Sequence, residues 1–210
     1  AVTIYHGDCR EIMPAQDDID FVLTDPPWGG RFNTDSTRFS GGTDREKRYG
    51  LGRNDWGPII GDDVAFDPQP FLEYSRVCLW GANHYAARLP MGTWLVWLKR
   101  DDHMFGQFLS DCELGWMKGG YGVYAHRKQF PPPSRMAENY GTVAHPTQKP
   151  LSLMKWCIGR ANLSGGSTIL DPYLGSGTTL RAAKDLGHKA IGIEIEERYC
   201  EIAAKRMSQT

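Results

Sequence analysis

The stretch from Ser167 to Glu194, STILDPYLGSGTTLRAAKDLGHKAIGIE, limits the possible folds more than any other part of the chain. It predicts a short apolar strand, a tight loop at Gly175 and Gly177, a helix that Gly187 ends, and a second strand that ends at Glu194. This order is half of a nucleotide-binding α/β fold, in which the glycines allow a tight turn and a close approach of the ligand.

The chemistry of the same stretch indicates the kind of nucleotide. Glu194 lies seventeen residues after Gly177, the position at which an acid binds ribose hydroxyls in the dinucleotide fingerprint. The third glycine of that fingerprint is replaced by Leu180, and the loop lacks the lysine of a P-loop. An adenosine ligand without phosphates therefore suits this loop better than a dinucleotide.

A second motif, Asp25-Pro26-Pro27-Trp28, follows the apolar run at 21–24. Proline has no backbone N–H, so this turn offers carbonyl and carboxylate oxygens, all of which accept hydrogen bonds. A nucleobase amino group has two hydrogens to donate, and a base removed from a helix can stack on an aromatic ring such as that of Trp28. The alternative is an Asp-Pro turn with a buried tryptophan.

Apolar periodicity predicts strands over 3–6, 20–25, 76–81, 93–99, 113–117, 121–126, 167–171 and 189–194. It predicts helices over 69–75, 83–89, 104–111, 151–162, 178–186 and 196–207. Alternating strands and helices indicate an α/β fold with a doubly wound, mainly parallel sheet. Two long irregular stretches interrupt the pattern, at 29–63 after the proline turn and at 117–147, and stretches of this length are usually functional.

Length and composition are those of one enzyme domain over residues 1–210. The five cysteines show no CxxC pair and no metal-ligand spacing, which indicates reduced thiols, no metal site and a cytoplasmic location. No run approaches the ~18 apolar residues of a membrane helix, so no membrane partner is expected.

The net charge of −1 does not favour nucleic acid, but the distribution of charge does. Basic residues are concentrated in the stretch after the proline turn and in a second stretch, 116–136, where they alternate with aromatic residues. Basic and aromatic groups together suit a phosphate backbone and unstacked bases. The residues predicted to contact nucleic acid are Arg31, Arg45, Lys47, Arg48, Arg53, Lys118, Arg127 and Lys128. The alternative is that these charges lie on solvated loops.

Three motifs together resemble those of a known family. Residues 25–28 match D-P-P-[YW], residues 145–150 read HPTQKP, and residues 171–179 read DPYLGSGTT where the family has D-P-F-x-G-S-G-T-T. The chain resembles the permuted β class of DNA amino-methyltransferases, which use S-adenosylmethionine. The resemblance covers essentially the whole chain, and Tyr173 in place of phenylalanine is a small departure.

The resemblance implies a catalytic role for Asp25, Pro26, Pro27 and Trp28. It implies that S-adenosylmethionine is bound by Asp8, Asp25, Thr147, Lys149, Asp171, Tyr173, Gly175, Gly177, Thr178 and Glu194. Asp8 is equally suited to cap a short helix, and Thr178 to begin one. His84 and Tyr85 are interpreted as structural residues near the mouth of the pocket.

The expected reaction is methyl transfer to N6 of adenine in duplex DNA, with the target base flipped out of the helix and the loop at 29–63 closing over it. A small target-recognition region is expected at about 104–145. The protein is also expected to form a homodimer. An aspartate at the first motif position is usual for adenine in this family. The alternatives are a cytosine-N4 or RNA-directed relative, a nicotinamide-dependent oxidoreductase, and a catalytically silent nucleic-acid binder.

Overall fold

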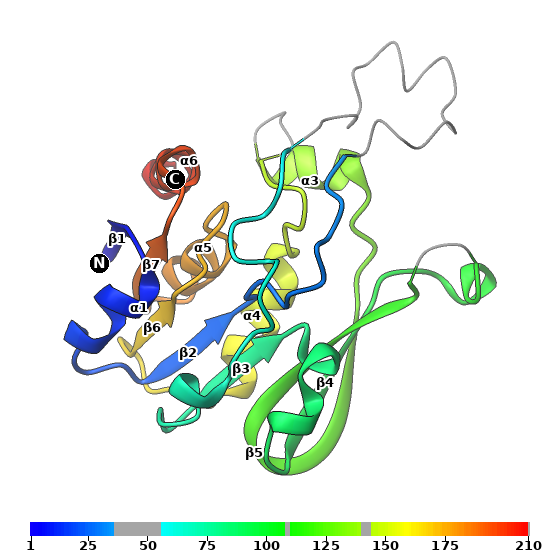
Figure 1. Ribbon diagram of the computed structural model, residues 1–210, viewed down its shortest axis with the longest axis horizontal. Coiled ribbons are helices and arrows are strands. Elements are labelled where there is room, and N and C mark those ends of the chain that lie inside the picture. The colour runs from blue at the N-terminus through cyan, green and yellow to red at the C-terminus, as the bar shows by residue number, and fades with distance from the viewer. Residues whose placement is uncertain (36–55, 108–109, 140–143, 210) are drawn as a thin grey trace.

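The computed structural model describes residues 1–35, 56–107, 110–139 and 144–209. Its centre is a seven-stranded sheet with the strand order β1-β7-β6-β2-β3-β5-β4 (Figure 1). The strands are β1 (Val2–His6), β2 (Phe21–Thr24), β3 (Val77–Trp80), β4 (Gly92–Leu98), β5 (Cys112–Arg127), β6 (Thr168–Asp171) and β7 (Lys189–Glu194). The predicted α/β fold with a mainly parallel sheet is confirmed.

Strands β1, β7, β6, β2 and β3 are parallel neighbours, so all five end at one edge of the sheet, called here the carboxyl edge. The long strand β5 bends at Gly119 and Gly120 and pairs with both sides of β4. Its first half is antiparallel to β3 and β4, with Trp94 opposite Trp116, and its second half is parallel to β4, with Trp94 opposite Val123. The start of β5 therefore lies at the carboxyl edge.

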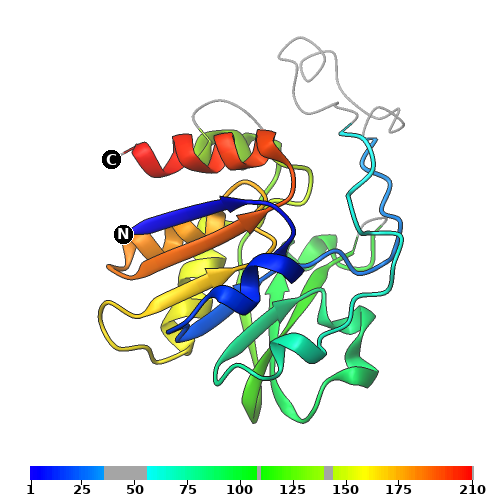
Figure 2. The same ribbon diagram turned by 60° about the vertical axis from the view of Figure 1, so that its left-hand side comes forward.

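Helices and helical turns cover both faces of the sheet (Figure 2). The α-helices are α1 (Cys9–Ile12), α3 (Pro132–Glu138), α4 (Leu151–Arg160), α5 (Thr178–Asp185) and α6 (Glu197–Ser208). The 3-10 turns are η1 (Met13–Ala15), η3 (Gln69–Phe71), η4 (Ala82–His84), η5 (Ala86–Arg88) and η6 (Asp102–Met104). One core lies between the sheet and α4, α5 and α6, and a second lies under α1, η1, η3 and η4.

The alternation along β2 shows how the sequence fills both cores. Phe21 and Leu23 point into the first core and Val22 into the second, and all three side chains are fully buried. Strands buried on both faces lose the alternation of polar and apolar residues, which is why the run at 21–24 is continuously apolar.

Several predicted elements are wrong. The helix expected at 69–75 is only the turn η3, whose C-cap is Leu72. The helix expected at 83–89 is two separate turns, η4 and η5. No α-helix is described within 104–111, where the Gly106 N–H bonds the Asp111 carboxylate instead.

Two further differences concern strands and loops. The strands expected at 113–117 and 121–126 are one bent strand, β5. The stretch expected to be irregular at 117–147 contains the helix α3, whose first turn accepts proline because the first N–H groups of a helix need no intrahelical partner.

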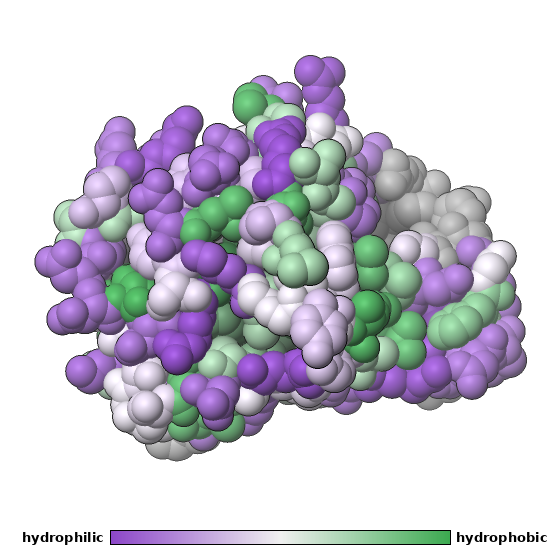
Figure 3. All heavy atoms as spheres, turned by 90° about the horizontal axis from the view of Figure 1, so that it is seen from below, coloured by the Kyte–Doolittle hydropathy of each residue, from purple (hydrophilic) through white to green (hydrophobic). Residues whose placement is uncertain are grey.

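The surface seen in Figure 3 carries several separate apolar patches among hydrophilic residues. Among the exposed apolar residues are Tyr121, Val123 and Tyr124 on the second half of β5. Within the described ranges, no helix has the length and apolar character required to cross a membrane.

Candidate active site

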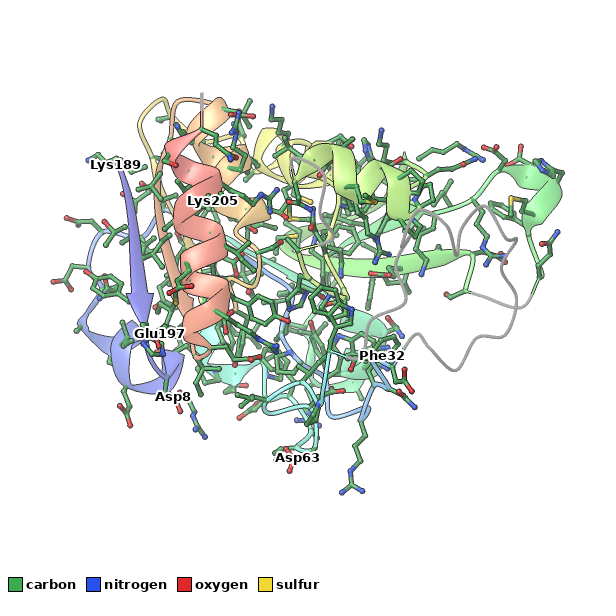
Figure 4. All side chains as sticks on the ribbon, turned by 90° about the horizontal axis from the view of Figure 1, so that it is seen from above. Asp8, Phe32, Asp63, Lys189, Glu197 and Lys205 are labelled. Atoms are coloured by element: carbon green, nitrogen blue, oxygen red, sulfur yellow. The ribbon has the colours of Figure 1, made fainter. Side chains whose placement is uncertain are left out.

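A cavity of about 1100 Å³ lies at the carboxyl edge of the sheet. From β6 the chain continues to β7 on one side, and from β2 it continues to β3 on the other side, so the strand order reverses between β6 and β2. Open α/β sheets bind ligands at this switch point, outside the carboxyl ends of the strands. In Figure 4 this edge faces the bottom of the view, and Asp8 and Phe32, which both line the cavity, lie to the left and right there.

Asp25 directly follows β2 and lines this cavity. Its Oδ2 accepts a hydrogen bond from Lys149 Nζ, whose other partner is Glu113 Oε2 at 3.1 Å. Its Oδ1 is buried and has no hydrogen-bond partner among the described residues. A buried acceptor without a partner is costly, and this oxygen is free to accept a hydrogen bond.

Burial raises the pKa of Asp25, the charge of Lys149 opposes this rise, and the charge of Glu113 adds to it. Burial alone would lower the pKa of Lys149, but the two carboxylates hold it above its ordinary value, so Lys149 is protonated. The ammonium group therefore favours the carboxylate form of Asp25.

Trp28 forms one wall of the cavity. Its ring stacks on His84, with centroids 4.0 Å apart and planes within 4°, and meets Phe32 edge-on at 6.4 Å. Gly81 makes room for this ring, because a side chain there would lie 2.5 Å from Trp28 Nε1. His84 therefore supports the ring of Trp28 by stacking on it. The sequence had suggested a structural role for His84 but not this contact.

Asp62 holds the turn that contains Trp28. Its Oδ1 accepts hydrogen bonds from the backbone N–H groups of Trp28, Gly29 and Gly30 at 3.0 to 3.1 Å, and its Oδ2 accepts one from Phe32 at 2.6 Å. Only 4% of Asp62 is exposed. One buried carboxylate therefore fixes the backbone that follows the proline turn.

Glu194 ends β7 and organises the glycine loop. Its Oε2 accepts the Gly175 N–H at 2.8 Å and its Oε1 accepts the Glu196 N–H at 2.9 Å. Burial raises its pKa, while these backbone donors oppose the rise. Each oxygen keeps a second acceptor position, and Glu194 lines the cavity, so hydroxyl groups of a ligand can be bound there.

Gly177 is required for packing at the end of the same loop. It has a φ of +79°, and a side chain there would lie 2.8 Å from the Cβ of Ala203 on α6. Behind the loop, the Arg206 guanidinium donates to the carbonyl of Ser176 at 2.6 Å and to the hydroxyl of Thr178 at 3.2 Å. These contacts attach the loop to α6 and leave its Gly175 side open to the cavity.

Asp171, at the end of β6, is buried next to Asp25. Its Oδ1 accepts hydrogen bonds from the Thr24 hydroxyl at 2.6 Å and from the Tyr173 N–H at 3.2 Å. Burial raises the pKa of Asp171 to about 6, against the effect of these donors. This residue therefore joins the two strands on either side of the switch point.

Asp8 caps α1, as one of its two interpretations predicted. Its carboxylate accepts the backbone N–H of Arg10 at 2.9 Å and is paired with the Arg10 guanidinium at 2.5 Å. Asp8 also lines the cavity, close to an aromatic wall in which Phe66 and Phe71 lie 6.1 and 6.2 Å from the Tyr173 ring. Its role toward a ligand stays a prediction.

The structure separates the predicted cofactor residues into two groups. The residues that line the cavity are Asp8, Asp25, Thr147, Tyr173, Gly175 and Glu194. The residues that lie behind its wall are Lys149, Asp171, Gly177 and Thr178. The second group supports the wall of the cavity. Pro26, Pro27 and Trp28 all line the cavity with Asp25.

The predicted nucleic-acid residues are dispersed. Arg45, Lys47, Arg48 and Arg53 lie outside the described residues, as does most of the loop expected to close over the base. Arg31 is exposed beside Phe32 at the cavity, and Lys128 is exposed after β5. Arg127 is paired with Asp102 at 2.5 Å, and Lys118 donates to the carbonyls of Leu72 and Tyr74 at the opposite edge of the sheet.

Sequence reasoning missed Asp62 and Glu113 as parts of the site. Asp62 lies in a polar loop and Glu113 begins a strand, and neither belongs to a motif. The stretch WGANHY did place His84 near the mouth of the pocket, and the structure adds its stacking on Trp28.

Comparison with known proteins identifies the family. The model of the N6/N4 methylase family, described as DNA methylase, matches residues 96–205, more than half of the chain. The chain belongs to the N6/N4 DNA methylase family. The matched residues contain the glycine loop and the HPTQKP segment, whereas the Asp25 turn precedes them.

Individual relatives agree with this assignment. A stretch of 63 residues is 51% identical to the type II methyltransferase M2.DpnII of Streptococcus pneumoniae and covers 30% of this chain and 23% of that protein. The chain thus matches less than a quarter of that relative.

Solved structures share the fold. The M1.HpyAVI–SAM complex is 21% identical with full coverage of both chains and a TM-score of 0.57. The cytosine-N4-specific PvuII DNA methyltransferase is 16% identical, with 98% of this chain and 86% of that chain covered and a TM-score of 0.60.

Proposed function

We propose that this chain transfers a methyl group from S-adenosylmethionine to an exocyclic amino group of DNA, namely N6 of adenine. The observation that supports this most is Asp25 Oδ1, a buried acceptor without a partner among the described residues, on a cavity wall shared with Trp28. An amino group on a planar base is a donor that fits an acceptor beside an aromatic ring.

The residues of the cavity fit the proposed cofactor. A volume of about 1100 Å³ is enough for a nucleoside cofactor together with a target base. Glu194 offers acceptors for ribose hydroxyls at one side, and the wall of Phe66, Phe71 and Tyr173 is apolar and aromatic. When bound, S-adenosylmethionine supplies a methyl group on a positively charged sulfur, which is already activated for transfer. The M1.HpyAVI–SAM complex, with the same fold, supports this choice.

The chain's own task is to make the amine nucleophilic. Its nitrogen lone pair is delocalised into the ring, and the nitrogen attacks only when its hydrogens are held out of the ring plane. Asp25 Oδ1 accepts one hydrogen and the Pro26 carbonyl accepts the other, while Lys149 keeps Asp25 as a carboxylate. The methyl–sulfur bond would break as the N–C bond forms, which leaves a neutral thioether, and the amine then releases one proton to Asp25 Oδ1, which passes it to water. Alignment of the two reactants provides the remainder of the catalysis.

The proposed substrate is duplex DNA with the target base flipped out. Only 22% of the Asp25 side chain is exposed, at the inner wall of the cavity, so a base stacked in a helix cannot reach it. Arg31 and Lys128 are exposed at or near the carboxyl edge, where they suit backbone phosphates.

Adenine is preferred because the first motif position is aspartate, which is usual for adenine in this family. Cytosine-N4 transfer is the second candidate, since the fold is shared with the cytosine-N4-specific PvuII enzyme. Mass spectrometry of nucleosides from treated DNA decides between them: N6-methyladenine is expected, and N4-methylcytosine alone would contradict the adenine assignment. Transfer to RNA and not to DNA would contradict the proposed substrate.

A further inference from the structure

Behind Asp25 lies a row of four alternating charges that extends from the cavity toward the surface. It consists of Asp25, Lys149, Glu113 and Lys99. Lys149 Nζ contacts Asp25 and, at 3.1 Å, Glu113 Oε2, and Lys99 Nζ contacts Glu113 Oε1 at 3.1 Å. The exposed fraction of the side chain is 22% for Asp25, 7% for Lys149, 31% for Glu113 and 25% for Lys99, so Lys149 is the most buried member of the row.

The topology of the sheet explains why these residues meet. Asp25 follows β2 and Lys99 follows β4, both at the carboxyl edge. Glu113 is the second residue of β5, and it reaches the same edge because the first half of β5 is antiparallel to its neighbours. Lys149 is brought in from the segment before α4.

The ammonium group of Lys149 is shared by two carboxylates, and this sharing weakens its ion pair with Asp25. With Asp25 as its only partner, Lys149 would draw the carboxylate fully into one ion pair and reduce its power to accept hydrogen bonds. Glu113 competes for the same ammonium, and Lys99 fixes the other oxygen of Glu113. Oδ1 of Asp25 thereby keeps its negative charge for the amine.

We propose that Glu113 is a positioning residue for methyl transfer, which acts on the substrate amine through Lys149 and Asp25. This inference rests on the proposed function. It assigns a role to a residue outside the three motifs, on a strand that sequence reasoning placed in the target-recognition region.

The test compares Glu113→Gln, which removes the charge and keeps the shape, with Glu113→Asp, which keeps the charge. Glu113→Gln should lower kcat on the order of 10- to 100-fold, because small misplacements of a reacting group have effects of this size. KM for DNA and the Kd of the cofactor should stay close to the wild-type values. Glu113→Asp should recover part of the lost kcat.

The pH profile provides a readout that a structural role would not move. The charged and titratable groups around Asp25 are Lys149, Glu113, Asp171 and Tyr85. Of these only Glu113 is changed, and its negative charge raises the pKa of Asp25. In Glu113→Gln the acid limb of kcat should therefore move to lower pH, whereas in Glu113→Asp it should stay near the wild-type position.

Asp185→Asn is the matched control, since Asp185 also joins two cations, Lys155 and Arg181, but on α5, outside the cavity lining. It should keep the wild-type kcat and acid limb. Glu113→Gln with an unchanged kcat and an unchanged acid limb overturns the inference. Carbon-13 NMR titration of the Asp25 carboxyl group measures the change in the pKa of Asp25 directly and needs no methyl transfer. If the protein methylates nothing, the proposed function is refuted, and this titration still tests the effect of Glu113 on Asp25.

Discussion

Replacement of Asp62 by alanine should loosen the turn that carries Trp28. The change removes the acceptors of four backbone N–H groups. Water can replace the acceptor for Gly30 and Phe32, which are exposed, but not fully for Trp28 and Gly29, which are partly buried. A net effect of about 1–2 kcal/mol for each of these two bonds gives about 2–4 kcal/mol in the free energy of local opening.

Amide hydrogen exchange measures this quantity directly. Because 1.36 kcal/mol corresponds to a factor of ten, the amides of Trp28 and Gly29 should exchange about 30- to 900-fold faster in the variant. Asp62→Asn keeps one acceptor oxygen and should show a smaller increase. The amides of β2 serve as an internal control and should keep their protection. Unchanged exchange at Trp28 and Gly29 would show that Asp62 does not hold the turn.

Three further predictions concern other parts of the site. Glu194→Ala should weaken the binding of S-adenosylmethionine in calorimetry at least tenfold and leave DNA affinity nearly intact, and an unchanged cofactor affinity would contradict the proposed ribose site. The pKa of Asp171 is about 6 in the folded protein and 3.8 ordinarily, so folding favours the protonated form of this residue. This contribution to the free energy of unfolding, up to about 3 kcal/mol, is fully present below pH 4 and is lost as pH rises through 6. Asp171→Asn should lack this component in urea titrations between pH 4 and 7, and an unchanged pH dependence would contradict it. Joint replacement of Arg127 and Lys128 by alanine should reduce the slope of log DNA affinity against log salt by up to about 2, if each residue contacts one phosphate. Lys205→Ala on α6 is the control and should keep the wild-type slope. A wild-type slope in the double variant would place the DNA elsewhere.

Local sequence signals predicted the parts of the fold that depend on neighbours in the chain. Apolar runs such as 168–170 formed strands, and Gly187 ended the helix α5 as expected. The turns η3, η4 and η5 were mistaken for longer helices, because the packing of Phe71, Ala82 and Tyr85 under the sheet imitates the apolar pattern of a helix.

The residues of the site likewise fall into those that a local sequence pattern reveals and those that it does not. Asp25 and Glu194 belong to motifs whose chemistry can be recognised in the sequence alone. Glu113 and Asp62 act on residues 88 and 34 positions away, and only the direction of β5 and the path of the chain after Asp25 bring them to the cavity. No local pattern reports such contacts. The division of the cofactor residues into lining and supporting groups likewise depends on how α6 packs against Gly177.

In the proposed reaction Asp25 prepares an exocyclic amine for methyl transfer, while other residues bind the cofactor. The most direct test measures tritiated methyl transfer to DNA by Asp25→Ala, together with its Kd for S-adenosylmethionine. Transfer should be lost, and the cofactor should still bind within several-fold of the wild-type affinity. A variant that keeps more than about a tenth of the wild-type activity, a loss of less than ~1.4 kcal/mol of transition-state stabilisation, would show that Asp25 is not the central group.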